Sequence, residues 1–289
     1  MSPNTDVIIR RATPQDAAVC GRICYDAFST VNAAHGFPCD FPAPEAAVGV
    51  ITSLFNAPGF YCVVAESHGH ILGSNCLDER SIIYGVGPIT VDPNTQNRGV
   101  GRKLMEAVLD RSREQNASGV RLVQAAFHNR SLSLYASLGF EVREPLVVLQ
   151  GRTRQRSVPG CTVRPATLED IATCNALSHR IHGFDRGADL AYSTQQGTAL
   201  IVEREGRVVG YSTGLAFFGH TTAESNQDLR ALLTSVESFG GAGFLVPKRN
   251  SELFRWCLSN GLRIVEPLTL MSIGLYSEPS GAWLPSILF

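Results

Sequence analysis

Apolar residues recur along this chain with the spacings of strands and helices, and glycines, prolines and polar turns separate the segments. Alternating apolar positions in β-branched and aromatic runs indicate strands, whereas apolar positions three and four residues apart indicate amphipathic helices. Between the first two helices, the segment from Asn32 to Glu45 contains three prolines and is predicted to be a loop. In the first half the pattern predicts strands at 7–11, 61–66, 71–77, 82–91, 120–127 and about 140–149, with helices from Thr13 to about Phe28, up to about Asn56, and at about 100–115 and 129–138.

The segment from Ile89 to Leu104 joins a strand to a helix through a turn that contains glycines. The β-branched residues at 89–91 end the strand, and Pro93-Asn94 interrupts it. From Val100 onward the pattern is helical, because one face collects apolar side chains and the opposite face collects charged ones. The apolar face contains Val100, Leu104, Met105, Val108 and Leu109.

This strand-to-helix connection is a candidate binding site for a pyrophosphate. The first backbone N–H groups of a helix lack intrahelical partners and lie at the positive end of the helix dipole, so they attract anions. Gly99 and Gly101 have no Cβ, which lets a phosphate approach the main chain closely. Arg98, Arg102 and Lys103 add positive charge. The alternative interpretation is an ordinary connection with two turn glycines.

The pattern restarts after residue 160, which indicates an internal repeat. Residues 163–170 match 9–16, residues 201–210 match 64–73, and residues 250–262 resemble 129–140. Three matches in the same order indicate two copies of one fold. The polar, basic segment at 151–160 is bounded by glycines. We therefore predict domains at 1–150 and 161–289, joined by a linker at 151–160.

The two copies differ where the first has its glycine turn. Between Gly210 and Gly241 the second copy has no basic, glycine-containing turn, and a helix is predicted at 229–236. Trp256 also stands at the position that corresponds to Tyr135, so the hydroxyl is missing. We expect the second domain to bind no cofactor.

Composition narrows the possible function classes. The 289 residues are 44% hydrophobic and 18% charged with a net charge of −1, which is typical of a globular protein and gives no electrostatic drive toward nucleic acid. No apolar run is long enough to cross a bilayer, and the first six residues lack the apolar segment of a secretory signal. We expect neither nucleic acid nor membrane as partner, and a cytoplasmic location.

The eight cysteines are scattered through apolar segments and form no C-x-x-C pair. Buried, reduced thiols are the expected state, in keeping with a cytoplasmic location. No cluster has the ligand spacing of a zinc site. His179 and His182 share a helix face, but a solvated or capping role is the better interpretation, and we expect no metal.

Residues 96–101, Gln-Asn-Arg-Gly-Val-Gly, resemble the Q/R-x-x-G-x-G/A signature of the GCN5-related N-acetyltransferase (GNAT) superfamily. Val91-Asp92-Pro93 resembles the V-x-P that usually precedes this signature. The resemblance is strong over 7–151 and weaker over 161–274, as in a degenerate second copy. It implies an α/β (α+β) fold of two tandem domains, each with a mixed, mostly antiparallel twisted sheet flanked by helices.

The resemblance also implies roles for individual residues. Acetyl-CoA would be the co-substrate, with its pyrophosphate on the amides of residues 98–102 and its pantetheine arm paired with the strand edge. Asn129 would contact the pantetheine and Tyr135 would protonate the leaving thiolate. Asn129 could instead cap its helix, and Tyr135 could be a core residue. The implied cofactor-binding residues are Ile89, Thr90, Val91, Gln96, Asn97, Arg98, Gly99, Val100, Gly101, Arg102, Asn129 and Tyr135.

The general base that would deprotonate the amine is not evident. Many family members have a glutamate on the strand that enters the glycine turn, but residues 84–90 contain no acid. Glu79 is the candidate that we assign. Asp78, His35, Asp40 and His128, or a water that relays to one of them, remain as alternatives.

The loop between the first two helices usually covers the acceptor site in this family. The resemblance therefore implies that residues 35–45 form the acceptor loop. Phe37 and Phe41 would contact an apolar part of the acceptor, and His35 or Asp40 would bind its polar part.

These observations predict an acetyl-CoA-dependent N-acetyltransferase that acts on a small-molecule amine by direct attack on the thioester in the N-terminal domain. One alternative is an acyl-CoA-binding sensor or pseudoenzyme, which the missing acid favours and Tyr135 disfavours. Another is an acyltransferase that uses a different acyl-CoA or a protein acceptor. The tandem chain is expected to be a monomer, as a pseudo-dimer, or a homodimer.

Overall fold

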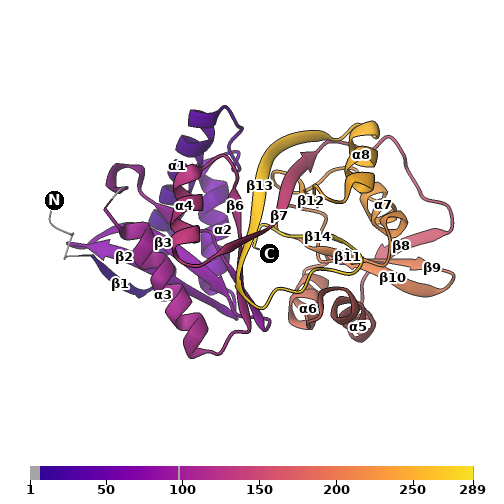
Figure 1. The fold of residues 1–289 in the computed structure, drawn as a ribbon, viewed down its shortest axis with the longest axis horizontal. Coiled ribbons are helices and arrows are strands. Elements are labelled where there is room, and N and C mark those ends of the chain that lie inside the picture. The colour runs from indigo at the N-terminus through magenta and orange to yellow at the C-terminus, as the bar shows by residue number, and fades with distance from the viewer. Residues whose placement is uncertain (1–6, 97, 289) are drawn as a thin grey trace. The chain divides into compact units, whose positions relative to one another are not determined.

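The computed structural model describes residues 7–96 and 98–288, which pack into two compact units (Figure 1). Of the described residues, unit 1 contains 7–122, 130–139 and 288, and unit 2 contains 123–129 and 140–287. The predicted domains follow the internal repeat of the sequence, whereas the two units are defined by contacts in space. The units therefore do not test the predicted domain boundaries, which remain a prediction.

The sheet of unit 1 is mostly antiparallel. β1 (Ile8–Arg11), β2 (Phe60–Ser67), β3 (His70–Asp78) and β4 (Ile83–Val86) pair in that order as antiparallel neighbours. β6 (Gly119–Ala125) is parallel to β4, and β5 (Thr90–Val91) pairs with β3 beyond the end of β4. The long strand predicted at 82–91 is therefore two strands, interrupted at residues 87–89.

Helices cover both faces of this sheet. α1 (Ala17–His35) and α2 (Pro44–Asn56) pack on the face that carries Cys62, Val64 and Cys76. α3 (Val100–Glu114) packs on the opposite face, where Asn75 donates a hydrogen bond to the carbonyl of Leu104 at 3.3 Å. α4 (Asn129–Ser137) follows β6, and short 3₁₀ turns at Pro14–Asp16 and Pro93–Thr95 precede α1 and α3.

Unit 2 contains two sheets. In the first, β14 (Ala282–Leu284), β11 (Thr221–Ala223), β10 (Arg207–Ser212), β9 (Leu200–Arg204) and β8 (Cys161–Pro165) are antiparallel neighbours in that order. In the second, β7 (Glu141–Gln150) lies between β12 (Phe244–Pro247) and β13 (Arg263–Gly274), and both pairings are antiparallel. A strand from the first half of the chain is thus hydrogen-bonded on both sides to strands from the second half.

The helices of unit 2 follow the order seen in unit 1. α5 (Ile171–His182) and α6 (Gly187–Gln195) pack with Ile201 and Tyr211 on one face of the first sheet. α7 (Asn226–Thr234) packs with Val202 and Val209 on the other face, and α8 (Ser251–Ser259) follows β12. A 3₁₀ turn at Leu168–Asp170 precedes α5, as one precedes α1. The mixed, mostly antiparallel sheets flanked by helices confirm the predicted fold class.

An ion-pair cluster occurs in both copies at matching positions. In unit 1, Arg10 contacts Asp16 at 2.8 Å and Glu66 at 2.7 Å. In unit 2, the corresponding Arg164 contacts Asp170 at 2.8 Å and Glu203 at 2.9 Å. In each copy the aspartate also accepts a hydrogen bond from the backbone N–H of the threonine three residues before it, which joins the first strand to the helix that follows.

Two predictions about local structure are wrong. α1 does not end near Phe28 but continues to His35, because the first proline comes only at Pro38 and Gly36 ends the helix with a φ of +75°. His35 is therefore on the last turn of a helix and not in the loop.

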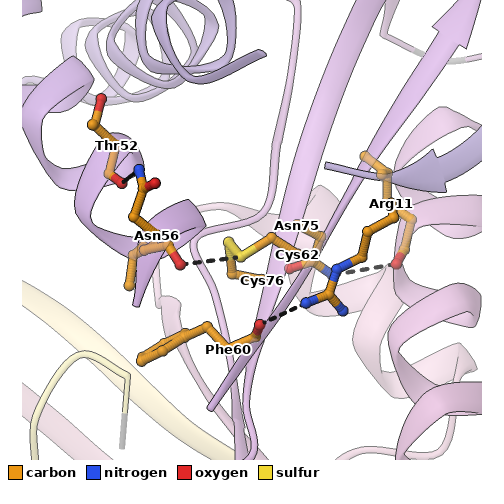
Figure 2. The surroundings of a disulfide bond; sticks show 9 residues. Arg11, Thr52, Asn56, Phe60, Cys62, Asn75 and Cys76 are labelled. Carbon is orange, nitrogen blue, oxygen red and sulfur yellow. Dashed lines mark hydrogen bonds between the residues drawn. A yellow bond between two sulfur atoms is a disulfide. The ribbon is translucent and has the colours of Figure 1, made fainter. Parts of the chain in front are cut away.

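The expectation that all cysteines are reduced is also wrong, because Cys62 and Cys76 form a disulfide (Figure 2). These residues are direct partners in the β2–β3 register, with their Cα atoms 4.1 Å apart. Cys62 lies five residues before the connection at 67–70 and Cys76 lies six residues after it, and the register shift between Ala65 and Glu66 brings the two cysteines opposite each other. The other six cysteines are free.

Candidate active site

The connection between β5 and α3 has the geometry of an anion site. Gly99 is the N-cap of α3, with a φ of +80° and no capping side chain. The first helical hydrogen bond runs from the backbone N–H of Lys103 to the carbonyl of Gly99 at 3.1 Å. The amides of Val100, Gly101 and Arg102 therefore precede the helical hydrogen-bond ladder. A Cβ placed at Gly99 meets nothing within 4 Å, so the main chain can be approached there.

The positive charges near this turn are not all directed at it. Arg98 is exposed, and Arg102 donates to the hydroxyl of Ser137 at 2.6 Å. Lys103 instead donates from its Nζ to the carbonyl of Val7 at 3.2 Å, beside β1. Two of the three predicted cations thus remain near the turn. Asn97, predicted to be part of this site, lies outside the described residues.

Side-chain hydrogen bonds hold the turn in place. Asp92 accepts a hydrogen bond from the backbone N–H of Asn94 at 2.8 Å, which shapes the 3₁₀ turn after β5. Gln96 donates to the carbonyl of Val91 at 3.3 Å and accepts from Arg130 of α4 at 3.2 Å. The motif glutamine therefore ties the turn to the strand before it and to α4.

The strand that leads into the turn has one edge available. In the part of the chain that the structure describes, β5 pairs only with β3, through Thr90 opposite Ser74 and Val91 opposite Gly73. Thr90 is buried, whereas Ile89 and Val91 are half-buried. An extended ligand could therefore pair with the other edge of these residues, as a strand would.

Tyr135 and Asn129 are both on α4. Tyr135 is only 8% exposed, and burial raises the pKa of its phenol well above the usual value. It therefore remains protonated at neutral pH and can donate a proton, although its burial also suits the structural role considered above. Asn129 is the first residue of the helix and is counted with unit 2.

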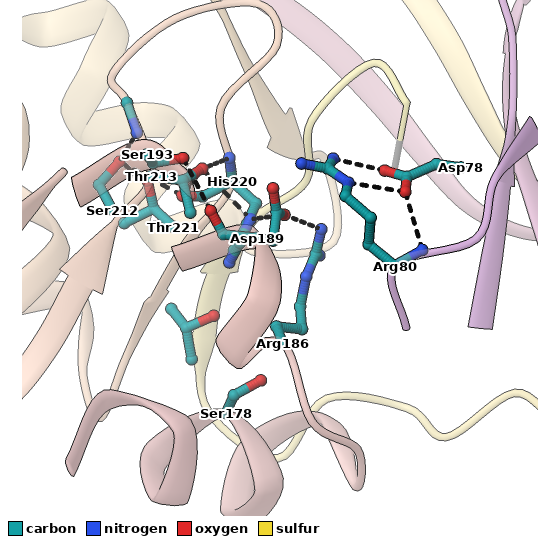
Figure 3. A network of polar contacts seen from close by, with 12 residues as sticks. Asp78, Arg80, Ser178, Arg186, Asp189, Ser193, Ser212, Thr213, His220 and Thr221 are labelled. Atoms are coloured by element: carbon teal, nitrogen blue, oxygen red, sulfur yellow. Dashed lines mark hydrogen bonds and ion pairs between the residues drawn. The ribbon is translucent and has the colours of Figure 1, made fainter. Parts of the chain in front are cut away.

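Two of the candidate bases are already engaged in ion pairs. The carboxylate of Glu79 accepts two hydrogen bonds from Arg111, at 2.7 and 3.2 Å, and Arg111 also lies over the ring of Tyr61. The carboxylate of Asp78 accepts hydrogen bonds from Arg80 (Figure 3). To accept a proton, the carboxylate of Glu79 must give up one or both of its hydrogen bonds from the guanidinium of Arg111.

The predicted acceptor residues are split between a helix end and the loop at 36–43. The Nδ1 of His35 lies 2.8 Å from the carbonyl of Val31 on the same helix. Asp40 accepts a hydrogen bond from the buried Asn32 at 3.3 Å. Phe41 is buried and packs edge-to-face on Phe28 with the ring centroids 6.0 Å apart, whereas Phe37 is half-buried.

Residues that the sequence did not single out also belong to this region. Tyr84 lies on β4, and its pKa is raised, first by burial and then by the charge of Glu79. Arg121 lies on β6 in register with Gly85 and is only 1% exposed. An arginine in the apolar run 119–125 was the available sequence signal, because a strand buried on both faces rarely holds a charge.

Unit 2 differs at the equivalent helix. α7 has Ser225 as its N-cap, and the serine side chain accepts a hydrogen bond from the backbone N–H of Asp228. Asp228 is fully buried and accepts from Arg204 at 3.1 Å. A side chain of the protein thus occupies the position that an anion would take at α3. A cavity of about 420 Å³ near this helix is lined mainly by polar and charged side chains, including Glu144, Glu224, Arg249 and Glu278.

A second polar cluster in unit 2 joins the buried Tyr211 and His220 to the half-buried Arg186 and Asp189 (Figure 3). Asp189 accepts a hydrogen bond from Arg186 at 2.9 Å, and its carboxylate lies 3.2 Å from the Nδ1 of His220. The Nε2 of His220 lies 3.1 Å from the hydroxyl of Tyr211, and burial raises the pKa of that phenol. These contacts join α6 to β10 and to the segment before β11.

Within residues 7–96 and 98–288, no group of three or more histidine, cysteine or acidic side chains is arranged to hold a metal. In the same residues, no helix has both the length and the apolar character needed to span a bilayer.

Residues 58–142 match a family model described as an acetyltransferase (GNAT) domain. No curated protein sequence matches the chain. A protein of Pyrococcus horikoshii described as an acetyltransferase has a similar structure, with a TM-score of 0.74 at 19% identity over 96% of this chain and 93% of that one.

Two further solved structures are similar over nearly the whole chain. A GCN5-related N-acetyltransferase from Sphaerobacter thermophilus has a TM-score of 0.63 at 16% identity and covers 96% of this chain and 98% of its own. A tandem GNAT protein from the clavulanic acid biosynthesis pathway has a TM-score of 0.55 at 14% identity, covering 92% and 98%. At these identities the likenesses show a shared fold.

Proposed function

We propose that this acyltransferase, whose residues 58–142 match an acetyltransferase (GNAT) domain, transfers an acetyl group from acetyl-CoA to the amine of a small molecule. The reaction takes place in the N-terminal domain. The turn between β5 and α3 binds the pyrophosphate of the co-substrate, and the second domain binds none.

The observation that supports this proposal best is the uncapped start of α3. Gly99 brings no side chain to the helix terminus, and the space next to it is open. The three amides that follow can therefore bind an anion at the positive end of the helix dipole. In unit 2, Ser225 caps the corresponding helix, so the same site is closed there.

The other residues of the chain bind and orient the reactants around this turn. The open edge of residues 89–91 pairs with the amides of the pantetheine arm, and Asn129 contacts the same arm. Bound acetyl-CoA supplies a thioester whose carbonyl carbon the amine attacks. A C–N bond forms, the C–S bond breaks, and the sulfur receives a proton from the phenol of Tyr135. The proton lost by the amine passes to Glu79, directly or through water.

The small, near-neutral acceptor is proposed from the net charge of −1 and from the loop at 36–43, where Phe37 and Asp40 offer both apolar and polar contacts. His35, on the last turn of α1, and Phe41 complete this set. We also propose a cytoplasmic location and a tandem chain that is a monomer or a homodimer. Six free cysteines favour the cytoplasm, whereas the disulfide does not.

Calorimetric titration of the purified chain with acetyl-CoA, followed by thiol release with a panel of small amines, tests the proposal. We expect one site per chain and thiol release that depends on the amine. Two sites would contradict the assignment of the cofactor to the N-terminal domain alone, and absence of binding would refute the proposed function.

A second candidate function is an acyl-CoA-binding sensor. The hydrogen bonds from Arg111 to Glu79 favour it, because they occupy the carboxylate that we assign as the base. Binding of acetyl-CoA without thiol release on any amine or protein acceptor would support the sensor. Release with longer acyl-CoA, but not with acetyl-CoA, would instead identify an acyltransferase of different chain-length preference.

A further inference from the structure

β4 and the residue after it present a strip without side chains on one face of the sheet. Gly85 lies opposite Asp78, and the backbone N–H of Gly87 donates to the carbonyl of Cys76 at 2.9 Å. Because side chains alternate along a strand, these two glycines face the same side as Cys76. That side carries α1 and α2, since Cys76 belongs to the hydrophobic cluster beneath them.

Leu288 occupies this glycine strip. Its carbonyl oxygen would clash with a Cβ at Gly85, so any larger residue at Gly85 would displace it. Its Cδ2 lies 3.7 Å from the corresponding position at Gly87. Leu288 is counted with unit 1, although the residues before it belong to unit 2. The backbone of β4 is therefore in van der Waals contact with a residue far away in the sequence.

The side chain of Leu288 extends the cluster that contains a proposed acceptor residue. Leu288 is half-buried and packs against the cluster that includes Phe41, Ile51 and Leu54. Phe41 belongs to the acceptor set of the proposed function. Leu288 thus adds an apolar, partly accessible surface between the glycine strip and that cluster.

We propose that Leu288 is a specificity-determining residue that lines the acceptor side of the site and limits the size of the apolar part of the amine. This inference rests on the proposed function. An apolar wall discriminates by size, because a bulkier acceptor must displace the leucine, whereas a smaller one fits beside it. The amines that react best are then those with a small apolar part.

Two variants of the full chain test this inference in different ways. Leu288→Ala removes the wall but leaves the glycine strip unchanged. Gly85→Ala leaves the leucine in the sequence and displaces it, because the new Cβ would meet the carbonyl of Leu288. The matched controls are Leu168→Ala, at a leucine that is 60% exposed, and Gly49→Ala, where a Cβ meets nothing within 4 Å.

The measurement is kcat/KM for a series of primary amines of increasing apolar size, together with the Kd for acetyl-CoA. For Leu288→Ala and Gly85→Ala we expect the ratio of bulky to small amines to rise about 10-fold. The Kd for acetyl-CoA should stay within about 2-fold of that of the unmodified chain, and both controls should keep its profile.

An unchanged size profile in a folded Leu288→Ala variant would overturn the inference, as would an equal change for every amine. A lower melting temperature with an unchanged profile would assign Leu288 to packing alone. These outcomes differ from failure of the proposed function, in which the unmodified chain itself shows no acetyl-CoA binding or no amine-dependent thiol release. If Gly85→Ala does not fold, Leu288→Ala decides alone.

Discussion

Tyr135 shows how much the interpretation of one side chain depends on its surroundings. In the sequence, it is both a match to a family motif and a plausible core position on a short helix. In the structure it is buried, and its raised pKa keeps the phenol protonated at neutral pH. That state is required of an acid that donates to a thiolate, but burial alone also suits packing. Kinetics of a variant can separate the two roles.

Replacing Tyr135 with phenylalanine removes the hydroxyl and keeps most of the packing. We expect kcat to fall about 100-fold or more, because general acid catalysis typically contributes that much. The affinity for acetyl-CoA should stay within about 2-fold. Thiol-release kinetics and calorimetry measure these two quantities. Tyr192→Phe, at a tyrosine that is 43% exposed, is the control and should change neither. Unchanged turnover in Tyr135→Phe would leave Tyr135 with a structural role only.

The disulfide is a residue-scale feature that composition did not reveal. Scattered cysteines without a C-x-x-C pair indicated reduced thiols. The pairing of Cys62 with Cys76, which are 14 residues apart, depends on the register of β2 and β3. Counting outward from the connection at 67–70 would have paired Cys62 with Asn75, and only the register shift between Ala65 and Glu66 brings Cys76 opposite Cys62.

At the scale of elements, the N-termini of α3 and α7 distinguish the two copies. Both helices follow a strand and pack on the corresponding face of their sheets. α3 begins after a glycine without a capping side chain, whereas Ser225 caps α7. A capped terminus has already satisfied the donors that an anion would need. We therefore propose that the N-terminus of this helix binds a phosphate group in the first copy and none in the second.

Gly99→Glu tests the terminus of α3. The added carboxylate would lie beside the amides and repel a pyrophosphate, so we expect the affinity for acetyl-CoA to fall at least about 100-fold. Calorimetry measures this loss. Gly160→Glu is a matched control, because Gly160 has a φ of +79° and, like Gly99, open space around a Cβ. Both variants carry similar backbone strain and the same added charge. Equal affinities in the two variants would contradict the proposed pyrophosphate site.

The C-terminal end of α1 could not be predicted from the local sequence pattern. The helix was predicted to end near Phe28 because the following residues lead into a proline-rich stretch. It continues to His35, and Asn32 on its last turns donates to the carbonyl of Pro38 and thereby anchors the loop. A buried asparagine that binds the loop made extension of the helix favourable. This contact is tertiary and leaves no periodic signal.

At the scale of the whole molecule, the chain repeats one fold, and an ion-pair cluster is repeated with it. Each copy has an arginine that binds an aspartate and a glutamate on separate elements. Hydrogen bonds from the arginine lower the pKa of Asp16 and of Asp170 to about 2, from an ordinary value of 3.8. The same ion-pair cluster therefore joins the first strand to the first helix in both copies.

These lowered pKa values predict how stability depends on pH. A carboxylate with a lower pKa in the folded state stabilises that state fully above its unfolded pKa, and the stabilisation is lost as pH falls from about 4 toward 2. Because the arginines are partly exposed, we expect each pair to contribute about 1–2 kcal/mol at pH 7. Asp16→Asn and Asp170→Asn should lower the free energy of unfolding by that amount at pH 7 and by much less near pH 2.

Urea unfolding at the two pH values measures this effect. The control is Asp110→Asn, which removes a pair whose side chains are 69% and 65% exposed and should cost less than about 0.5 kcal/mol. If each variant lost the same free energy of unfolding at pH 7 and near pH 2, the charge of the aspartates would not be what stabilises the fold.

Prediction from sequence succeeded where the information is local. The β5–α3 connection and the strands predicted at 61–66 and 71–77 rest on residues close together in sequence, and the structure confirms these elements. The site residues remain predictions even so. The sequence did not show that Arg111 engages Glu79 or that Phe41 packs on Phe28, since each contact joins segments that only the fold brings together.

The sequence by itself determined the order of the elements, the repeat and the glycine turn, because each follows from residue types at short spacing. Tertiary structure alone decided three further features. It placed β7 between β12 and β13, joined Cys62 to Cys76, and brought Leu288 against Gly85. The first and third of these features connect residues that are distant in sequence, and all three depend on burial and register across the fold rather than on any local preference of the chain.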